Sequence, residues 1–395
     1  MSGLGIMHVV GTLDPAAGGP PVVAARLAAA QANLGHRVTL AAYNGDPQST
    51  QRASELLEQT PNGDLVKLVW VARPSRFERL TGRNAARTLG PVLDDGINVL
   101  HCHGMWEPLL PTTAREASRR GIPFVVMPHG MLDPYTLTIS TTKKKIALAT
   151  THRAYVRRAM FFHMLNADEA SLARPVIGDH PTRVIPNGIF LDEVESAPPR
   201  GTFRASMPEL GGAKYVLFLS RLTHKKGLDY LAQAFAKVAE QMPDVHLVVA
   251  GPDDGVQARF EADVRQAGVA DRVHVVGPIY GSAKYAAIRD AAVFCLPSRQ
   301  EGFSIAITEA LALGVPVVVT RACHFPEVSE VGAGIETELD ARDVARALLE
   351  VLGDPAAAER MGRAGADLVR ERFTWPEVGR QSIEAYQATL GRDTA

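Results

Sequence analysis

The sequence predicts an α/β protein built from two Rossmann-like domains, each with a doubly wound parallel sheet. Its 395 residues exceed the size at which one hydrophobic core keeps growing, so two domains of about 200 residues are expected. Short apolar runs alternate with helical patterns in both halves, as in a parallel sheet that carries helices on its faces. A stretch rich in Pro and Gly, at about residues 194–212, separates the two series and reads as a linker.

The first series starts with an apolar run at residues 6–10. Pro20 and Pro21 suit the first turn of the helix that follows, and Gly35 suits the position just past its end. The other strands of this half are expected at residues 38–42, 66–71, 97–101, 124–127 and 160–164, and residues 183–188 close it with a strand and a turn. Together these elements define a first domain, residues 1–195.

The second series follows the linker and defines a second domain, residues 205–375. Its strands are expected at residues 215–219, 246–250, 273–276, 293–296 and 315–319. The chain then closes with helical patterns at about 341–352, 355–372 and 376–391.

The composition is that of an ordinary globular protein, with 46% hydrophobic and 22% charged residues. The net charge of −1 gives no general attraction to nucleic acid, so no nucleic-acid partner is expected. Cys102, Cys295 and Cys323 lack the spacing of a zinc site or a redox pair, and a reducing cytoplasm fits them best. Neither a signal-peptide pattern nor a run of membrane-spanning length is found, so a cytoplasmic location is expected.

Two glutamates, Glu301 and Glu309, flank a Gly-Phe-Ser turn and the start of an apolar helical pattern. The turn follows a buried strand, so it lies where open α/β sheets bind ligands and where unpaired N–H groups attract anions. Glu309 lies among apolar helix positions and needs a partner there, such as a pair of vicinal hydroxyls. The segment therefore predicts a site for a phosphorylated ligand that is rich in hydroxyls.

A second motif places Arg221 and Lys226 directly after the first strand of the second domain. Basic charge at the start of a helix is unfavourable unless an anion offsets it. A diphosphate suits the planar fork of Arg and the compact charge of Lys. The alternative is a solvated basic turn without a ligand.

The spacing of Glu301 and Glu309 resembles the E-x7-E signature of the retaining glycosyltransferases of family 4. Residues 221–227 resemble the R-L-x-x-x-K-G segment of the same family, and the resemblance covers nearly the whole chain. It implies a GT-B fold, in which two domains face a cleft and the last helix, here residues 376–395, crosses back onto the first domain. It also implies transfer of a sugar from a nucleotide diphosphate to an acceptor hydroxyl, with retention of the anomeric configuration.

The resemblance also assigns roles to individual residues. As catalytic groups, Glu301 would hold donor-sugar hydroxyls, Arg221 and Lys226 the donor phosphates, and His129 would meet the sugar near its reacting carbon. His103 is a candidate on the acceptor side, or it packs against Trp106. The residues expected to bind the donor are Gly18, Gly19, Ile279, Gly302, Phe303, Ser304, Ile305 and Glu309, the last through the ribose.

No D-x-D spacing occurs in the chain. Other glycosyltransferases use this carboxylate pair to hold a metal-bound diphosphate, so we expect a metal-independent enzyme without a cofactor. Arg221, Lys226 and the helix start at Ser304 would then balance the charge of the leaving group.

The expected function is that of a hexosyltransferase in polysaccharide or glycolipid biosynthesis, with a UDP- or GDP-sugar donor and a saccharide or lipid-linked acceptor. Two alternatives stay open: a GT-B relative with other chemistry, such as an epimerase or a phosphorylase, and a non-catalytic subunit that binds nucleotide sugars. A dinucleotide-dependent dehydrogenase is disfavoured because no G-x-G-x-x-G follows the first strand. The basic stretch from Lys143 to Arg158 is either a solvated helix face or a peripheral contact with the inner membrane.

Overall fold

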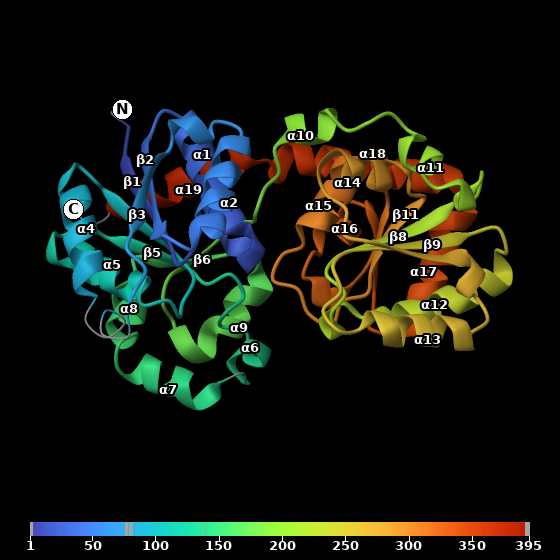
Figure 1. Ribbon diagram of the computed structural model, residues 1–395, viewed down its shortest axis with the longest axis horizontal. Helices are drawn as coiled ribbons and strands as arrows, with labels where there is room; N and C mark the ends of the chain where they lie inside the picture. Colours follow the sequence, from blue (N-terminus) through green and yellow to red (C-terminus); the bar gives the residue numbers. More distant parts are fainter. Residues whose placement is uncertain (1–2, 76–77, 79–81, 139, 392–395) are drawn as a thin grey trace. The chain divides into compact units, whose positions relative to one another are not determined.

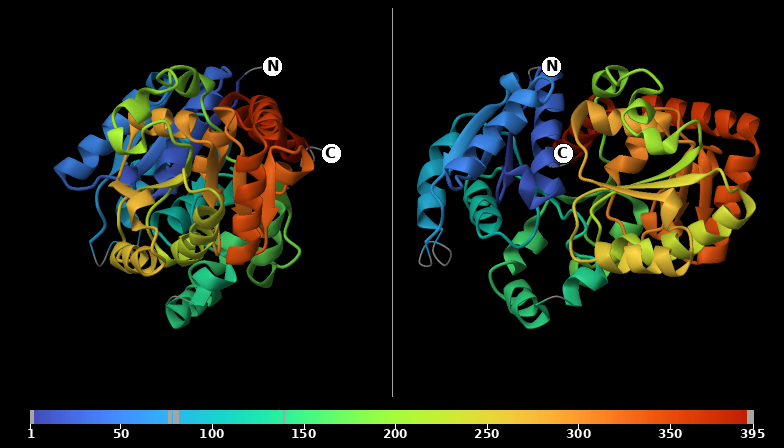
Figure 2. Two further views of the ribbon diagram at one scale, coloured as in Figure 1. Left: turned by 90° about the vertical axis from the view of Figure 1, so that its right-hand side faces the viewer. Right: turned by 45° about the vertical axis from the view of Figure 1, so that its right-hand side comes forward.

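The computed structural model describes residues 3–75, 78, 82–138 and 140–391. The chain forms two compact units, Met1–Asn187 with Trp375–Ala395 (unit 1) and Gly188–Thr374 (unit 2). Each unit contains one parallel sheet with helices on both faces, so the predicted α/β class is confirmed (Figures 1 and 2). Within the described residues, no helix combines the length and the apolar character needed to cross a lipid bilayer.

Unit 1 has a seven-stranded sheet in the order β3-β2-β1-β4-β5-β6-β7, as far as its residues are described. The strands are β1 Gly5–Val10, β2 Arg37–Tyr43, β3 Lys67–Val71, β4 Val99–His103, β5 Phe124–Met127, β6 Phe161–Met164 and β7 Thr182–Val184. Met7 and Val9 point into the hydrophobic core on one face, so His8, between them, points to the other face. His8 and His101 are direct partners across β1 and β4.

The helices of unit 1 cover both faces of this sheet. The helices α1 and α19 pack together on one face, whereas α4, α5 and α8 cover the other (Figure 1). A Cβ atom at Gly379 in α19 would lie 3.2 Å from the Cβ of Ala30 in α1, so a small residue is needed at this contact. The described helices are α1 Gly19–Asn33, α2 Pro47–Gln59, α4 Arg83–Asp94, α5 Leu109–Arg119, α6 Pro134–Thr138, α7 Thr141–Ala149, α8 Arg153–Arg158, α9 Ala167–Ile177 and α19 Trp375–Leu390.

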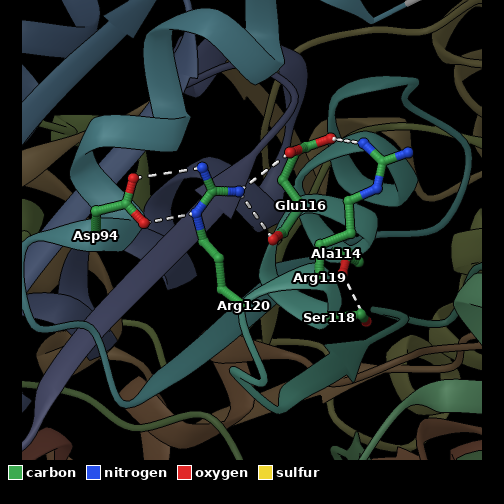
Figure 3. Close-up of polar contacts among 6 residues, drawn as sticks. All are labelled: Asp94, Ala114, Glu116, Ser118, Arg119 and Arg120. Carbon is green, nitrogen blue, oxygen red and sulfur yellow. Dashed lines mark hydrogen bonds and ion pairs between the residues drawn. The ribbon is translucent and has the colours of Figure 1, made fainter.

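An ion-pair network fastens α4 to the end of α5 (Figure 3). Arg120 donates to Asp94 at 2.8 Å and to Glu116 at 3.1 Å. Arg119 donates to the other oxygen of Glu116 at 2.7 Å. Glu116 is buried, so these two guanidinium groups balance its negative charge in place of water.

Unit 2 has a six-stranded parallel sheet, as described, in the order β10-β9-β8-β11-β12-β13. The strands are β8 Tyr215–Leu219, β9 His246–Ala250, β10 Val273–Gly277, β11 Val293–Leu296, β12 Val317–Thr320 and β13 Gly334–Thr337. The helices α12, α13 and α17 cover one face and α14 and α15 the other (Figure 1). The helices of this unit are α10 Leu191–Glu195, α11 Thr202–Ala205, α12 Leu228–Gln241, α13 Gln257–Gln266, α14 Gly281–Asp290, α15 Ile305–Ala312, α16 Glu327–Glu330, α17 Ala341–Gly353 and α18 Pro355–Arg372.

Two predicted boundaries need correction. Residues 188–195 were assigned to the first domain, but Ile189 and Val194 are buried in the core of unit 2, and this burial determines where the segment belongs. The stretch at residues 194–212 is not a free linker. Its backbone N–H groups at Gly201 and Phe203 donate to the buried carboxylate of Asp290, at 2.6 and 3.0 Å.

Two strands also differ from the sequence prediction. The strand β4 runs two residues later than expected, so His103 is its last residue and does not follow it. The edge strand β13 was not predicted at all. Its four residues, Gly-Ile-Glu-Thr, include a single large apolar side chain and leave no strand signature in the sequence.

Candidate active site

Most of the residues predicted to bind the donor line one cavity in unit 2. Its volume is about 340 Å³, within the usual range for small-molecule sites. The cavity lies beyond the carboxyl ends of β8 and β9 and at the amino end of α15. Its lining includes the predicted residues Arg221, Lys226, Ile279, Glu301, Phe303, Ser304, Ile305 and Glu309. Gly302 belongs to the same loop, between two lining residues.

Glu301 is held in place by three hydrogen bonds. One carboxylate oxygen accepts from the Ser298 hydroxyl at 2.5 Å and from Lys226 Nζ at 2.6 Å. The other accepts from Lys226 Nζ at 2.8 Å. Glu301 is only 9% exposed, so its charge is compensated locally, and its orientation is set before any ligand arrives.

The loop that carries Lys226 is packed tightly against the loop that carries Glu301. A Cβ at Gly227 would lie 1.9 Å from the carbonyl oxygen of Pro297, and φ is +70° there, so only glycine fits. Arg299 donates to the His224 carbonyl at 2.8 Å and forms an ion pair with Asp229 at 2.6 Å. These contacts hold the loop of Lys226, the predicted phosphate-binding residue, against the loop of Glu301, the predicted sugar-binding residue.

Glu309 has a partner that the sequence analysis missed. Lys284, in α14, donates to Glu309 Oε1 at 2.5 Å, and both residues line the cavity. The sequence offered only an isolated lysine in a helical pattern, without a motif to connect it to α15. The carboxylate that was expected to need a partner such as vicinal hydroxyls is therefore paired with a cation.

Other groups in the lining of the cavity are suited to an anion. The side chain of Arg221 is exposed, and within the described chain it has no hydrogen-bond or ion-pair partner. The first N–H groups of α15 lack intrahelical acceptors, and the N-cap residue Ser304 makes no side-chain cap bond. Five charged side chains line the cavity, namely Arg221, Lys226, Lys284, Glu301 and Glu309. Their net charge is +1, which an anionic ligand can balance.

The predicted residues of unit 1 fall into two groups. Gly18 and Gly19 form the turn into α1, where Gly18 has φ of +116° and nothing lies within 4 Å of a Cβ at either position. His129 follows β5 and adopts a left-handed conformation with φ of +54°. His103, at the end of β4, donates or accepts through Nδ1 at 3.2 Å from His129 Nε2. His103 therefore contacts His129 and is 2% exposed, which places it beneath His129 in the core.

The turn at His129 is fastened from outside β5. Glu169, a buried residue of α9, accepts from the Gly130 N–H at 2.5 Å and from the Leu165 N–H at 2.6 Å. Left-handed backbone costs energy for a residue with a side chain, so these bonds help to hold the turn. Glu169 was also missed, because an acidic residue in a first helical turn usually signals only a favourable helix start.

A buried polar cluster lies beneath His103. His8 Nδ1 is 2.8 Å from His103 Nε2, and His8 Nε2 is 2.7 Å from Gln31 Oε1 in α1. Burial lowers the pKa of His8 to about 4 and that of His129 to about 3, and the pKa of His103 also lies well below its ordinary value. These rings are therefore neutral near pH 7. The sequence shows His8 only as one polar residue in an apolar strand.

Both halves of the chain match known families. Residues 18–188 match the family described as glycosyl transferase 4-like domain, and residues 200–368 match the family described as glycosyl transferases group 1. Each match covers most of one structural unit, and together they cover most of the chain.

Several curated relatives are named as mannosyltransferases. The phosphatidyl-myo-inositol mannosyltransferase of Mycobacterium leprae is 36% identical over 214 residues, which cover 52% of this chain and 54% of that protein. The MMP α-(1→4)-mannosyltransferase of Mycolicibacterium hassiacum is 31% identical over 176 residues, covering 43% of this chain and 42% of that protein. The chain thus spans about half the length of the curated relatives it matches.

Solved structures resemble the chain over nearly its full length. Anabaena Alr3699/HepE in complex with UDP has a TM-score of 0.78 at 18% identity, covering 98% of this chain and all of that one. Sucrose-phosphate synthase from Thermosynechococcus elongatus has a TM-score of 0.74 at 22% identity, with the same coverage. These likenesses confirm the predicted GT-B fold. The two family matches, which together cover most of the chain, show that it belongs to the group 1 glycosyltransferases of family 4.

Proposed function

We propose that this protein is a retaining glycosyltransferase that moves a hexosyl unit from a nucleotide-diphosphate sugar to an acceptor hydroxyl. The observation that carries the proposal is the cavity in unit 2, which combines Arg221, without a side-chain partner among the described residues, with two glutamates that are each paired with a lysine. Such a lining offers cations for phosphate oxygens and acceptors for hydroxyls in one space.

Each part of the donor has a matching group in this cavity. Arg221, Lys226 and the start of α15 would take the diphosphate, because they supply charge and free N–H groups. Glu301 would accept from sugar hydroxyls, and Glu309 would accept from the ribose. Ile279 lies at the cavity wall, where it suits the apolar face of the base. The proposed role of His129 at the sugar rests on the family resemblance.

We further propose that the reaction needs no metal ion. The leaving nucleoside diphosphate would gain negative charge, and Arg221, Lys226 and the helix dipole of α15, all at this cavity, would stabilise it. The test is transfer activity after exhaustive treatment with EDTA. Full activity supports the proposal, and activity that returns only with added Mn²⁺ or Mg²⁺ contradicts it.

GDP-mannose is the donor we would test first, because the relatives above are named as mannosyltransferases. One of the more distant relatives, from Corynebacterium glutamicum, is named as GDP-mannose-dependent, at 26% identity over 228 residues. A panel of GDP-mannose, UDP-glucose, UDP-galactose and UDP-N-acetylglucosamine, read by thermal shift and by donor hydrolysis, would identify the donor. The anomeric configuration of the product then tests retention.

The same panel separates the proposal from its rivals. A non-catalytic subunit would bind one donor without hydrolysing or transferring it. An epimerase would return a changed nucleotide sugar without transfer, and a phosphorylase would require inorganic phosphate as the second substrate. Stabilisation by NAD(P) with no response to nucleotide sugars would contradict the proposal altogether.

We propose a lipid-linked or saccharide acceptor, with peripheral membrane contact through α7 and α8. No side chain of α7 is buried, and Ile146 is 60% exposed beside Lys143 and Lys145. An exposed apolar residue among lysines suits the surface of an anionic bilayer. Sedimentation with vesicles that contain anionic lipid tests the contact, with neutral vesicles as the control.

A further inference from the structure

We propose that Gln31, His8 and His103 are positioning residues that hold His129 in one tautomer, with its proton on Nε2 and a bare Nδ1 facing outward. They do so through a directed chain of hydrogen bonds that crosses the core of unit 1. The inference concerns the state of one side chain. Its consequence for catalysis rests on the proposed function.

The chain of contacts is continuous. Gln31 Oε1 lies 2.7 Å from His8 Nε2, and His8 Nδ1 lies 2.8 Å from His103 Nε2. His103 Nδ1 lies 3.2 Å from His129 Nε2. Gln31, His8 and His103 are 0%, 0% and 2% exposed, so bulk water cannot replace any of their partners.

The direction of the hydrogen-bond chain is set at Gln31, where it begins. An amide can be turned either way, so its partners decide which end is the oxygen. The Ser382 hydroxyl donates its one proton to the Gly379 carbonyl at 2.7 Å, and therefore Ser382 can only accept from Gln31, at 2.7 Å. The NH₂ group of Gln31 must face Ser382, which leaves the Gln31 oxygen facing His8.

From Gln31 onward, the tautomer of each histidine ring determines the tautomer of the next ring. His8 must donate through Nε2 to the Gln31 oxygen, and a neutral imidazole carries only one N–H, so His8 Nδ1 accepts. His103 must then donate through Nε2, which leaves its Nδ1 as an acceptor. His129 must in turn donate through Nε2. Burial keeps these rings neutral by lowering their pKa values, so a second proton does not break the sequence.

The result is a bare nitrogen at the outer end. Within the described residues, His129 Nδ1 has no hydrogen-bond partner. The atom is also not fully buried, because it is missing from the set of buried polar atoms without a partner. His129 itself is half-buried, and its turn is held by the bond from Gly130 to Glu169. The geometry therefore presents an acceptor, and a substrate hydroxyl is the class of group that it would bind.

A shared metal ion is the main alternative use of this cluster, since the ring nitrogens of His8, His101 and His103 lie within 4.8 Å of one another. A ring nitrogen binds a metal along its lone pair, in the plane of the ring. The rings of His101 and His103 are stacked, with planes 18° apart and centroids 4.6 Å apart, so their lone pairs do not converge on one point. His8 Nδ1 and His103 Nε2 are also already bonded to each other. The contacts favour the hydrogen-bonded chain.

The test is long-range ¹H–¹⁵N correlation NMR of protein labelled with ¹⁵N-histidine, because the two tautomers give different nitrogen shifts. The variant His129→Gln assigns the signal. We expect the Nε2–H tautomer for His129 in the wild-type protein near pH 7. The Nδ1–H tautomer, or a charged ring, would overturn the inference whatever the enzyme does with sugars.

Two variants of nearly equal shape test the chain itself. In His8→Gln the amide can donate to Gln31 and accept from His103, which keeps the direction, whereas His8→Met can do neither. We expect H8Q to keep the tautomer of His129 and H8M to yield a mixture, with kcat lowered in proportion to the loss of the Nε2–H form and KM changed less than about threefold. His163→Asn is the control, because His163 is buried on the same face and bonds only to the Ile185 carbonyl among the contacts described.

Other outcomes are equally decisive. An H8M protein that folds and keeps a single His129 tautomer would refute the chain, even if its activity falls. A stoichiometric metal in the purified protein, whose removal shifts the signals of His8 and His103, would replace the chain with a metal site. If H8M does not fold, the wild-type tautomer alone decides. A correct tautomer without donor hydrolysis would instead count against the proposed function.

Discussion

Lys284 in α14 and Glu309 in α15 form an ion pair at 2.5 Å inside the proposed donor cavity. The side chain of Glu309 is only 5% exposed and that of Lys284 is 23% exposed, so the pair is largely shielded from water. A ligand that places two hydroxyls on Glu309 must share this carboxylate with Lys284. The lysine thereby keeps an anionic site from repelling an anionic donor.

Breaking this pair from one side should destabilise unit 2. Lys284→Met leaves a buried carboxylate without its cation, and we expect a loss of about 1–3 kcal/mol in the free energy of unfolding. Adding Glu309→Gln to the same protein should restore part of the loss, because it removes the unpaired charge. Urea unfolding of both single variants and the double variant gives the coupling energy, and a value near zero would contradict the pairing.

The guanidinium of Arg221 should matter for binding of the donor phosphates and not for binding of the rest of the donor. We expect Arg221→Met to weaken nucleoside diphosphate binding about tenfold, the size of one lost charge-assisted bond. Nucleoside binding should be unchanged. Lys237→Met, which removes an exposed cation of α12, is the matched control. Isothermal titration would refute the assignment if nucleoside and nucleoside diphosphate lost affinity equally.

The central strands were predictable from sequence because their signal is local. The strands β5, β8, β9 and β11 have the predicted bounds, since each is an apolar run closed by polar or turn residues. The Glu301 to Glu309 segment was readable for the same reason. A strand, a turn and a helix follow one another within about twenty residues of chain.

The partners of these residues were not predictable, because they come from distant parts of the chain. Lys284 lies 25 residues from Glu309, and Gln31 lies 351 residues from Ser382. Neither pair leaves a spacing or a period in the sequence. The role of His8 depends on which face of β1 it occupies and on the register between β1 and β4, and only the folded sheet determines both.

The buried histidines should make stability fall in mild acid. The pKa of His8 and of His163 is lowered to about 4 by burial, so the unfolded chain takes up protons first as the pH falls below about 6.5. Above that pH the free energy of unfolding has its full value. It falls as the pH drops toward 4, by up to about 1.4 kcal/mol per pH unit for each histidine. Urea midpoints from pH 8 to 5 test this. His163→Asn should flatten the slope, whereas the exposed control His224→Asn should not, and equal slopes in the two variants would contradict the cause.

Two adjacent arginines at the end of α5, Arg119 and Arg120, form ion pairs of different kinds (Figure 3). One pair is structural and the other lies at the surface. Arg120 bridges Asp94 and Glu116, and its side chain is 28% exposed, whereas Arg119 is 65% exposed and, among the described residues, forms an ion pair only with Glu116. We expect Arg120→Met to cost about 1–2 kcal/mol, because it frees α4 from α5 and weakens the support of buried Glu116. Arg119→Met should cost less than about 0.5 kcal/mol, as exposed pairs contribute little. Chemical unfolding of both variants decides, and equal losses would show that Glu116 depends on total charge and not on the bridge.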